Sequence, residues 1–346
     1  MKREPRLALV VAATALVACG LGARPAPDPR AAVSSDLVWP EPPARARIRL
    51  VRTLARPADV EGPPSLWRRV IGIFAGRDDE GFVRPTGVAV GGKLVYVADA
   101  GLPALWIIDL EEGRIRRIGA AGAERFVSPV AVALGPGGRV YLADSARARI
   151  FVLDPEGRPV GAISQPGMLR PAGVACDRAR DRLYVADSAA HRVWIFRGDG
   201  AAAGAFGRHG AAGGELNFPT HVAVDRDGTV SVTDALNYRI ERFGPDGAFL
   251  GAIGEHGDAS GDLAAPKGVA LDSAGHLYVV DALFDAVQIF DREGRYLLAF
   301  GGRGTAPGQF WLPTGLAIDG RDRIYVADSY NQRVQVFEYL GGDGDG

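Results

Sequence analysis

An aspartate recurs six times along this chain of 346 residues, and an arginine follows it by five positions in four of the six copies. The aspartates are Asp99, Asp144, Asp187, Asp234, Asp281 and Asp328, and the arginines are Arg149, Arg192, Arg239 and Arg333. Carboxylate and guanidinium groups at this spacing can form charge-assisted hydrogen bonds. We therefore predict four structural pairs that fix loops, namely Asp144–Arg149, Asp187–Arg192, Asp234–Arg239 and Asp328–Arg333.

These aspartates belong to a longer repeat that begins with a proline. The prolines lie 42 to 48 residues apart, at Pro85, Pro129, Pro171, Pro219, Pro266 and Pro313. Each precedes a short apolar strand, and a second apolar strand ends at the aspartate. A proline just before a strand costs no hydrogen bond of the sheet. Repeats of this length, with about four short strands each, are the size of β-propeller blades.

Two segments carry a resemblance to a known repeat family. The residues Pro-Thr-Gly-Val-Ala-Val at 85–90 and Tyr-Val-Ala-Asp-Ser-Tyr-Asn-Gln-Arg at 325–333 resemble NHL repeats. The resemblance covers roughly residues 82–339 and implies an all-β fold, a six-bladed β-propeller. It leaves function open, because the family includes adaptors, scaffolds and a few enzymes.

The sixth copy lacks the outer strand that the other copies have. It ends near Tyr339, and only a Gly-rich tail follows at residues 341–346. The segment Ile48–Leu54 has the composition of a strand, and we predict that it pairs with Val334–Phe337 and closes the propeller. This closure would leave no open sheet edge between the first and last blades.

Residues 65–75 predict one short amphipathic helix before the first blade. Apolar residues recur there at helical spacing after Ser65, a plausible N-cap. Two interpretations stay open. The helix either covers an apolar patch of the propeller, or it presents Trp67, Arg68 and Arg69 to a partner or a membrane.

The N-terminus predicts export. Residues 1–19 combine basic side chains with a short apolar run and end in Leu-Val-Ala-Cys, which resembles a bacterial lipobox with lipidation at Cys19. Gly20 then favours the outer membrane by resemblance to sorting rules. Residues 20–46 are rich in Pro and Ala and predict a disordered tether before a propeller at 47–340. A net charge of −1 gives no general attraction to nucleic acid.

In an up-and-down blade, the start of the first strand and the end of the second share one rim, called here the first rim. It should carry the Pro-Thr-Gly segments and the Ala-Asp-Ser loops. We predict that it binds an envelope protein, a peptide or a glycan, as a monomeric propeller. The candidate contact residues are Arg84, Arg170, His221, Asn237, Tyr238, Lys267, Phe284, Trp311, Tyr330, Asn331 and Gln332. Exposed aromatic and cationic side chains are typical of recognition surfaces.

An enzyme is the alternative. By resemblance to the peptide-amidating lyases, which are NHL-like propellers, His209, His221 and His256 could hold zinc. By resemblance to lactonase propellers, asparagines in the channel could hold calcium, and the chain offers Asn217, Asn237 and Asn331. The sequence favours a non-catalytic binding protein that has no cofactor and no metal.

Overall fold

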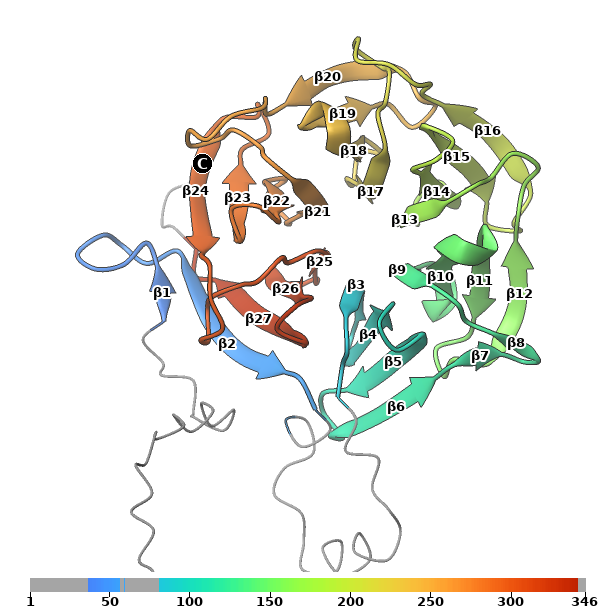
Figure 1. Ribbon diagram of the computed structural model, residues 1–346, viewed down its shortest axis with the longest axis horizontal. Coiled ribbons are helices and arrows are strands. Elements are labelled where there is room, and N and C mark those ends of the chain that lie inside the picture. Colours follow the sequence, from blue (N-terminus) through green and yellow to red (C-terminus); the bar gives the residue numbers. More distant parts are fainter. Residues whose placement is uncertain (1–36, 57–58, 60–80, 342–346) are drawn as a thin grey trace, which may run out of the picture. The chain divides into compact units, whose positions relative to one another are not determined.

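A computed structural model describes residues 37–56, 59 and 81–341 of the chain. Six antiparallel sheets stand around a central axis as the blades of a propeller (Figure 1). The expected all-β, six-bladed fold is therefore confirmed. The lipidation site Cys19, the helix expected at 65–75 and the tail after residue 341 lie outside the described residues.

Blades 1 to 5 each contain four strands, in chain order from the axis outward. Blade 1 has β3 (Pro85–Gly91), β4 (Leu94–Asp99), β5 (Ala104–Asp109) and β6 (Arg114–Ile118); blade 2 has β9 (Pro129–Leu134), β10 (Val140–Asp144), β11 (Arg149–Leu153) and β12 (Pro159–Ile163). Blade 3 has β13 (Pro171–Asp177), β14 (Arg182–Asp187), β15 (Arg192–Arg197) and β16 (Ala202–Phe206); blade 4 has β17 (Pro219–Val224), β18 (Val230–Asp234), β19 (Arg239–Phe243) and β20 (Phe249–Ile253). Blade 5 has β21 (Pro266–Leu271), β22 (Leu277–Asp281), β23 (Ala286–Phe290) and β24 (Tyr296–Gly301).

Blade 6 takes its strands from both ends of the described chain. Its inner strands are β25 (Leu316–Ile318), β26 (Arg323–Asp328) and β27 (Arg333–Tyr339), and β2 (Ile48–Leu54) pairs antiparallel with β27. A two-residue strand, β1 (Val38–Trp39), adds to the far edge of β2. The Trp39 ring lies 5.8 Å from that of Phe337 and 6.1 Å from that of Phe300 in blade 5. Ordered structure therefore begins before residue 47, inside the segment expected to be a tether.

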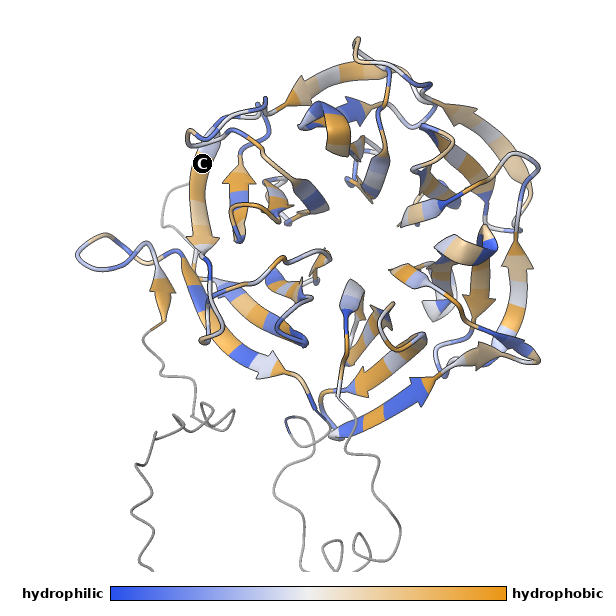
Figure 2. Cartoon of the chain, viewed as in Figure 1, coloured by the Kyte–Doolittle hydropathy of each residue, from blue (hydrophilic) through white to orange (hydrophobic). Residues whose placement is uncertain are grey.

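The hydrophobic core is divided among the boundaries between blades. Six clusters of buried side chains each join two neighbouring blades, including one that joins blade 6 to blade 1. The second strand of each blade is buried on both faces, because the adjacent sheets cover it from both sides. Outer strands are more exposed although most carry apolar residues, and β6, with three arginines among its five residues, is the most hydrophilic of them (Figure 2).

Glycines near the axis allow the inner strands to approach closely. A Cβ at Gly315 would lie 2.5 Å from the carbonyl oxygen of Thr86, and one at Gly173 would lie 2.7 Å from that of Thr220. The blades therefore meet backbone to backbone at these points, where no side chain fits.

The connections that the structure describes contain little helix. Three short 3₁₀ helices occur in the part of the chain that the structure describes, η1 (Pro136–Gly138), η2 (Ser145–Arg147) and η3 (Ala235–Asn237). A small hairpin, β7 (Ala120–Ala121) with β8 (Glu124–Arg125), links blades 1 and 2. None of the helices in the described ranges is long and apolar enough to cross a membrane.

Strand register defines the two rims. Pro85 lies opposite Asp99, Pro171 opposite Asp187 and Pro219 opposite Asp234. The repeat prolines and the repeat aspartates therefore share the first rim, as predicted. The hairpin turns between first and second strands, and between third and fourth strands, form the second rim.

Candidate partner-binding rim

The six repeat aspartates organise the first rim from below its surface. All six are fully buried, and their carboxylates accept hydrogen bonds from backbone N–H groups. Asp99 shows the pattern, since it accepts from Val83 at 2.7 Å and Arg84 at 2.9 Å, and from Gly101 and Leu102 in its own loop. One carboxylate therefore ties together the two segments that form the rim in its blade.

Two of the four predicted Asp–Arg pairs form. Arg239 Nε donates to Asp234 at 3.0 Å, and Arg333 Nε donates to Asp328 at 2.7 Å. Each arginine also donates to three carbonyl oxygens of the loop that precedes its blade: Ala211, Ala212 and Glu215 for Arg239, and Thr305, Ala306 and Gln309 for Arg333.

The predicted pairs Asp144–Arg149 and Asp187–Arg192 are wrong. Arg149 bonds Glu124 at 2.5 Å, and the guanidinium of Arg192 stacks over the Trp194 ring at 5.2 Å. The physical reason lies in the preceding loops. The hairpin β7–β8 precedes blade 2 and a short segment, 164–170, precedes blade 3, so neither supplies the group of carbonyl oxygens that holds the arginine in blades 4 and 6.

Exposed apolar side chains follow the first rim. Four of them lie two residues before the repeat proline and three lie two residues after the repeat aspartate, and each is 43% to 66% exposed. We name these seven the apolar rim set: Val83, Val127, Leu169, Leu236, Leu283, Trp311 and Tyr330. The amides of Val83, Val127, Leu169 and Trp311 donate to the buried aspartates, so their backbones are fixed while their side chains face solvent.

A cavity of about 410 Å³ lies in the first rim where blade 6 meets blade 1. Its lining comes from Val83, Arg84, Ala100 and Gly101 of blade 1 and from Ser329, Tyr330 and Gln332 of blade 6. The Tyr330 ring also packs beside Trp311, with 5.7 Å between ring centroids. The cavity thus combines aromatic surface with one exposed guanidinium, that of Arg84, a composition typical of protein-binding sites.

The other predicted contact residues differ in how far they are engaged with the protein itself. Asn237 donates to Asp234 and to the Gly210 carbonyl, and Asn331 does the same with Asp328 and Gly304. Tyr238 lies against the His256 ring at 4.1 Å, and Phe284 is half-buried. Arg170 and Gln332 are exposed on the rim.

His221 and Lys267 lie deeper, on the inner strands β17 and β21 of neighbouring blades. His221 stands where four of the other blades have glycine after Pro-x. Burial lowers the pKa of His221 to about 3, and the charge of Lys267 acts in the same direction. Burial also lowers the pKa of Lys267, against the opposing charge of Asp281. His221 is therefore neutral at physiological pH.

The histidines considered for zinc occupy separate environments. His209 packs against His191 at 4.4 Å, His256 packs against Tyr238, and His221 lies on β17. Within residues 37–56, 59 and 81–341, no three His, Cys, Asp or Glu side chains gather in a way that could hold a metal ion.

Sequence reasoning missed five members of the apolar rim set: Val83, Val127, Leu169, Leu236 and Leu283. A signal for them was present, because they occupy the same repeat positions as Trp311 and Tyr330. Aliphatic residues draw less attention than aromatic residues, yet the amides of Val83, Val127 and Leu169 donate to buried aspartates as that of Trp311 does.

Comparisons with known proteins agree with the fold. The NHL repeat family matches residues 168–196 and 310–337. No curated protein sequence matches the chain. An auxiliary nutrient binding protein from Bacteroides thetaiotaomicron has a similar structure, with a TM-score of 0.60 and 14% identity over 76% of this chain and 71% of that one.

Two further solved structures are similar over most of their length. A catalytically inactive virginiamycin B lyase from Staphylococcus aureus, with quinupristin, has a TM-score of 0.57 and 15% identity over 74% of this chain and 95% of that one. A chain of a nidogen/laminin complex has a TM-score of 0.55 and 20% identity over 72% of this chain and 88% of that one. At such identities the similarity shows the fold alone.

Proposed function

We propose that this chain, a six-bladed β-propeller with NHL repeats, is a non-catalytic lipoprotein of the bacterial envelope that binds a protein or peptide through its first rim. The observation that carries the proposal is the apolar rim set. Seven large apolar side chains are exposed on one rim, and buried aspartates fix the backbone beneath four of them. Exposed apolar surface held on a rigid frame supports binding with little loss of conformational entropy.

The chemistry of the rim favours a protein or peptide over a glycan. Five of the seven side chains in the apolar rim set are aliphatic, and aliphatic contacts suit apolar side chains of a partner better than polar sugars. Trp311 and Tyr330 supply an aromatic pair beside the cavity of the first rim, and Arg84 supplies a cation in its lining. We infer that one apolar or acidic anchor of the partner enters this cavity.

Known propellers of this shape bind other molecules. The similar structures include an auxiliary nutrient binding protein and a component of a nidogen/laminin complex. They support a binding role for the scaffold in general, while our choice of a protein or peptide as the partner rests on the rim chemistry.

The lipid anchor is part of the proposal. The sequence around Cys19 resembles a lipobox, and acylation there would tether the propeller to the envelope. Replacing Cys19 with serine should abolish incorporation of a labelled fatty acid and release the chain from the membrane fraction. Unchanged labelling of the Cys19→Ser variant would overturn the anchor and leave the rim proposal untouched.

The rim is tested by affinity capture from envelope extracts with the full chain. We expect the double variant Trp311→Ala, Tyr330→Ala to weaken capture of the dominant partner at least tenfold, because aromatic anchors contribute about 2 kcal/mol or more each. The matched control is Val160→Ala with Leu250→Ala, which truncates two exposed apolar side chains that lie on outer strands.

Equal weakening by both double variants would refute the choice of rim, as would unchanged capture by the rim variant. Treatment of the extract separates the partner classes. Loss of capture after protease digestion supports a protein or peptide. Loss after periodate oxidation, with resistance to protease, would overturn that choice in favour of a glycan.

A further inference from the structure

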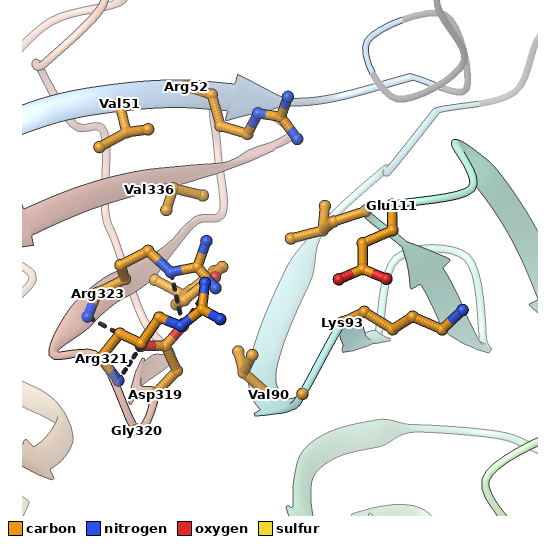
Figure 3. A pocket seen from close by; sticks show the side chains of 13 residues that line it. Val51, Arg52, Val90, Lys93, Glu111, Asp319, Gly320, Arg321, Arg323 and Val336 are labelled. Carbon is orange, nitrogen blue, oxygen red and sulfur yellow. Dashed lines mark hydrogen bonds and ion pairs between the residues drawn. The ribbon is translucent and has the colours of Figure 1, made fainter.

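We propose that a second site, on the rim opposite the apolar rim set, binds a small phosphomonoester that carries an apolar group. The site is a cavity of about 800 Å³ between blades 6 and 1, formed by hairpin turns of the second rim and by β2 (Figure 3). It lies outside the partner-binding rim and is independent of that function. A cavity of this size is in the range of small-molecule sites.

On the second rim, blades 6 and 1 lack a tyrosine bond that joins two other pairs of blades. Between blades 1 and 2, the Tyr96 hydroxyl donates to the Pro155 carbonyl at 3.1 Å, and between blades 3 and 4, Tyr184 donates to Pro245 at 2.8 Å. The equivalent tyrosines of blades 5 and 6 donate instead to an aspartate of their own blade, Tyr278 to Asp272 at 3.2 Å and Tyr325 to Asp319 at 3.3 Å. No tyrosine bond therefore bridges this boundary among the described residues.

The turn of blade 1 that would receive Tyr325 also differs in sequence. Blade 2 turns through Asp-Pro-Glu-Gly-Arg at 154–158, whereas blade 1 has Asp-Leu-Glu-Glu-Gly-Arg at 109–114, which is one residue longer and lacks proline. The receiving carbonyl of the proline is thus replaced by Leu110 and Glu111, which line the cavity.

The charge of the lining is positive. It includes four basic side chains, Arg52, Lys93, Arg321 and Arg323, and two acidic ones, Glu111 and Asp319. Arg323 is paired with Asp319 at 2.7 Å, and Lys93 is paired with Asp109 at 3.0 Å.

Once these pairs are set aside, the lining leaves the two arginines Arg52 and Arg321 and one carboxylate, Glu111. Among the described residues, neither guanidinium makes a hydrogen bond or ion pair, and Figure 3 shows both beside the same opening. Their forked donors match the oxygens of a phosphate group, and an anionic phosphomonoester would offset the positive charge that the two arginines leave in excess of Glu111.

The rest of the lining suits an apolar group. Val51, Val90 and Val336 contribute aliphatic surface from three different strands. Val51 is 41% exposed, and the register of β2 against β27 shifts at this residue, between Leu50 and Arg52. A ligand with a small apolar group next to its phosphate would cover this surface while the guanidinium groups hold the phosphate.

The test is isothermal titration calorimetry of the full chain with phenyl phosphate, inorganic phosphate and benzyl alcohol. We expect saturable 1:1 binding of phenyl phosphate, weaker binding of inorganic phosphate, and none of benzyl alcohol. The double variant Arg52→Gln, Arg321→Gln should weaken phenyl phosphate binding at least tenfold. The matched control is Arg226→Gln, which removes an exposed arginine from the corresponding turn of blade 4 and should change affinity less than twofold.

Three outcomes would overturn the proposal. These are no binding of phenyl phosphate at millimolar concentration, equal binding by the wild type and the double variant, and equal weakening by the Arg226→Gln control. Both target arginines lie on the surface, so a thermal melt of the double variant should match the wild type. The variant Trp311→Ala, Tyr330→Ala should retain phenyl phosphate binding, which separates this site from the partner-binding rim.

Discussion

Glu241 is a buried carboxylate where neighbouring blades place an amide. It lies in β19, and the same position of blades 5 and 6 is occupied by Gln288 and Gln335. Each glutamine accepts a hydrogen bond from a loop N–H and donates its own N–H to a loop carbonyl. Glu241 accepts from Gly214 at 3.3 Å, but its Oε2 is buried and has no partner among the described residues.

Burial raises the pKa of Glu241 from 4.5 to about 7. The charge of Arg239, whose Nη2 lies 2.8 Å from the carboxylate, opposes this rise, and the nearby charge of Asp234 adds to it. The folded state therefore holds a proton that the unfolded state releases between pH 4.5 and 7. Stability falls as the pH rises through this window, and the full cost of about 3 kcal/mol applies above pH 7.

Replacing Glu241 with glutamine should remove this cost. We expect Glu241→Gln to raise the free energy of unfolding by up to about 3 kcal/mol at pH 8 and to change it little at pH 4, where the carboxyl group is already protonated. Urea denaturation of both proteins at pH 4, 6 and 8 measures the difference. The reverse variant, Gln335→Glu, is the matched control. It places a carboxylate where Gln335 donates to Asp328 at 3.2 Å, so it should create a pH-dependent loss of stability.

Two results would refute this reasoning. A stability gain of Glu241→Gln that is equal at pH 4 and pH 8 would mean that the charge of the carboxylate is not its cause. A loss of stability at pH 8 would mean that the ionised pair with Arg239 stabilises the fold by more than the burial of the carboxylate costs.

Two further predictions concern the frame of the propeller. Deleting residues 47–55 should lower the free energy of unfolding by about 5 kcal/mol or more, because Ile48, Leu50 and Leu54 are buried and each contributes about 2 kcal/mol; a thermal melt like that of the wild type would show that β2 does not close the ring. Asp187→Asn should lower the free energy of unfolding by about 2 to 4 kcal/mol, because this one carboxylate accepts hydrogen bonds from the amides of Leu169, Arg170 and Ala190 and from the Trp194 indole. Urea denaturation at neutral pH measures the loss. Equal stability of the variant and the wild type would contradict the role of the buried aspartates.

The blades could be predicted from the sequence because their markers act through the backbone. A proline before a strand and an aspartate that caps a loop have the same effect in every copy, so their spacing alone located β3, β9, β13, β17 and β21. The Asp–Arg pairs depend on more than their own repeat. Arg239 and Arg333 are held by carbonyl oxygens of loops that precede their blades, and the spacing of five residues carries no information about those loops.

The binding rim could be predicted in position but only partly in composition. Its location follows from strand register. The outward direction of Leu169 or Leu283 depends instead on which backbone N–H groups donate hydrogen bonds to the buried aspartate. Asn237 and Asn331 were predicted to contact a partner, but their side-chain N–H groups donate to carbonyl oxygens of the protein itself.

The boundary between blades 6 and 1 is where the repeat imposes the weakest constraint. Elsewhere, each blade meets the next one along a continuous chain, whereas here β2, from the N-terminal side, stands beside β27 and the turns of blade 1. The tyrosine bonds that blades 1 and 3 make to the next blade have no equivalent among the described residues either here or between blades 5 and 6. Cavities of about 410 Å³ and 800 Å³ lie on its two rims. Because neither cavity is filled by a repeated contact, substitutions there can change ligand binding without disturbing the other five boundaries, which is why both binding experiments are directed at this one.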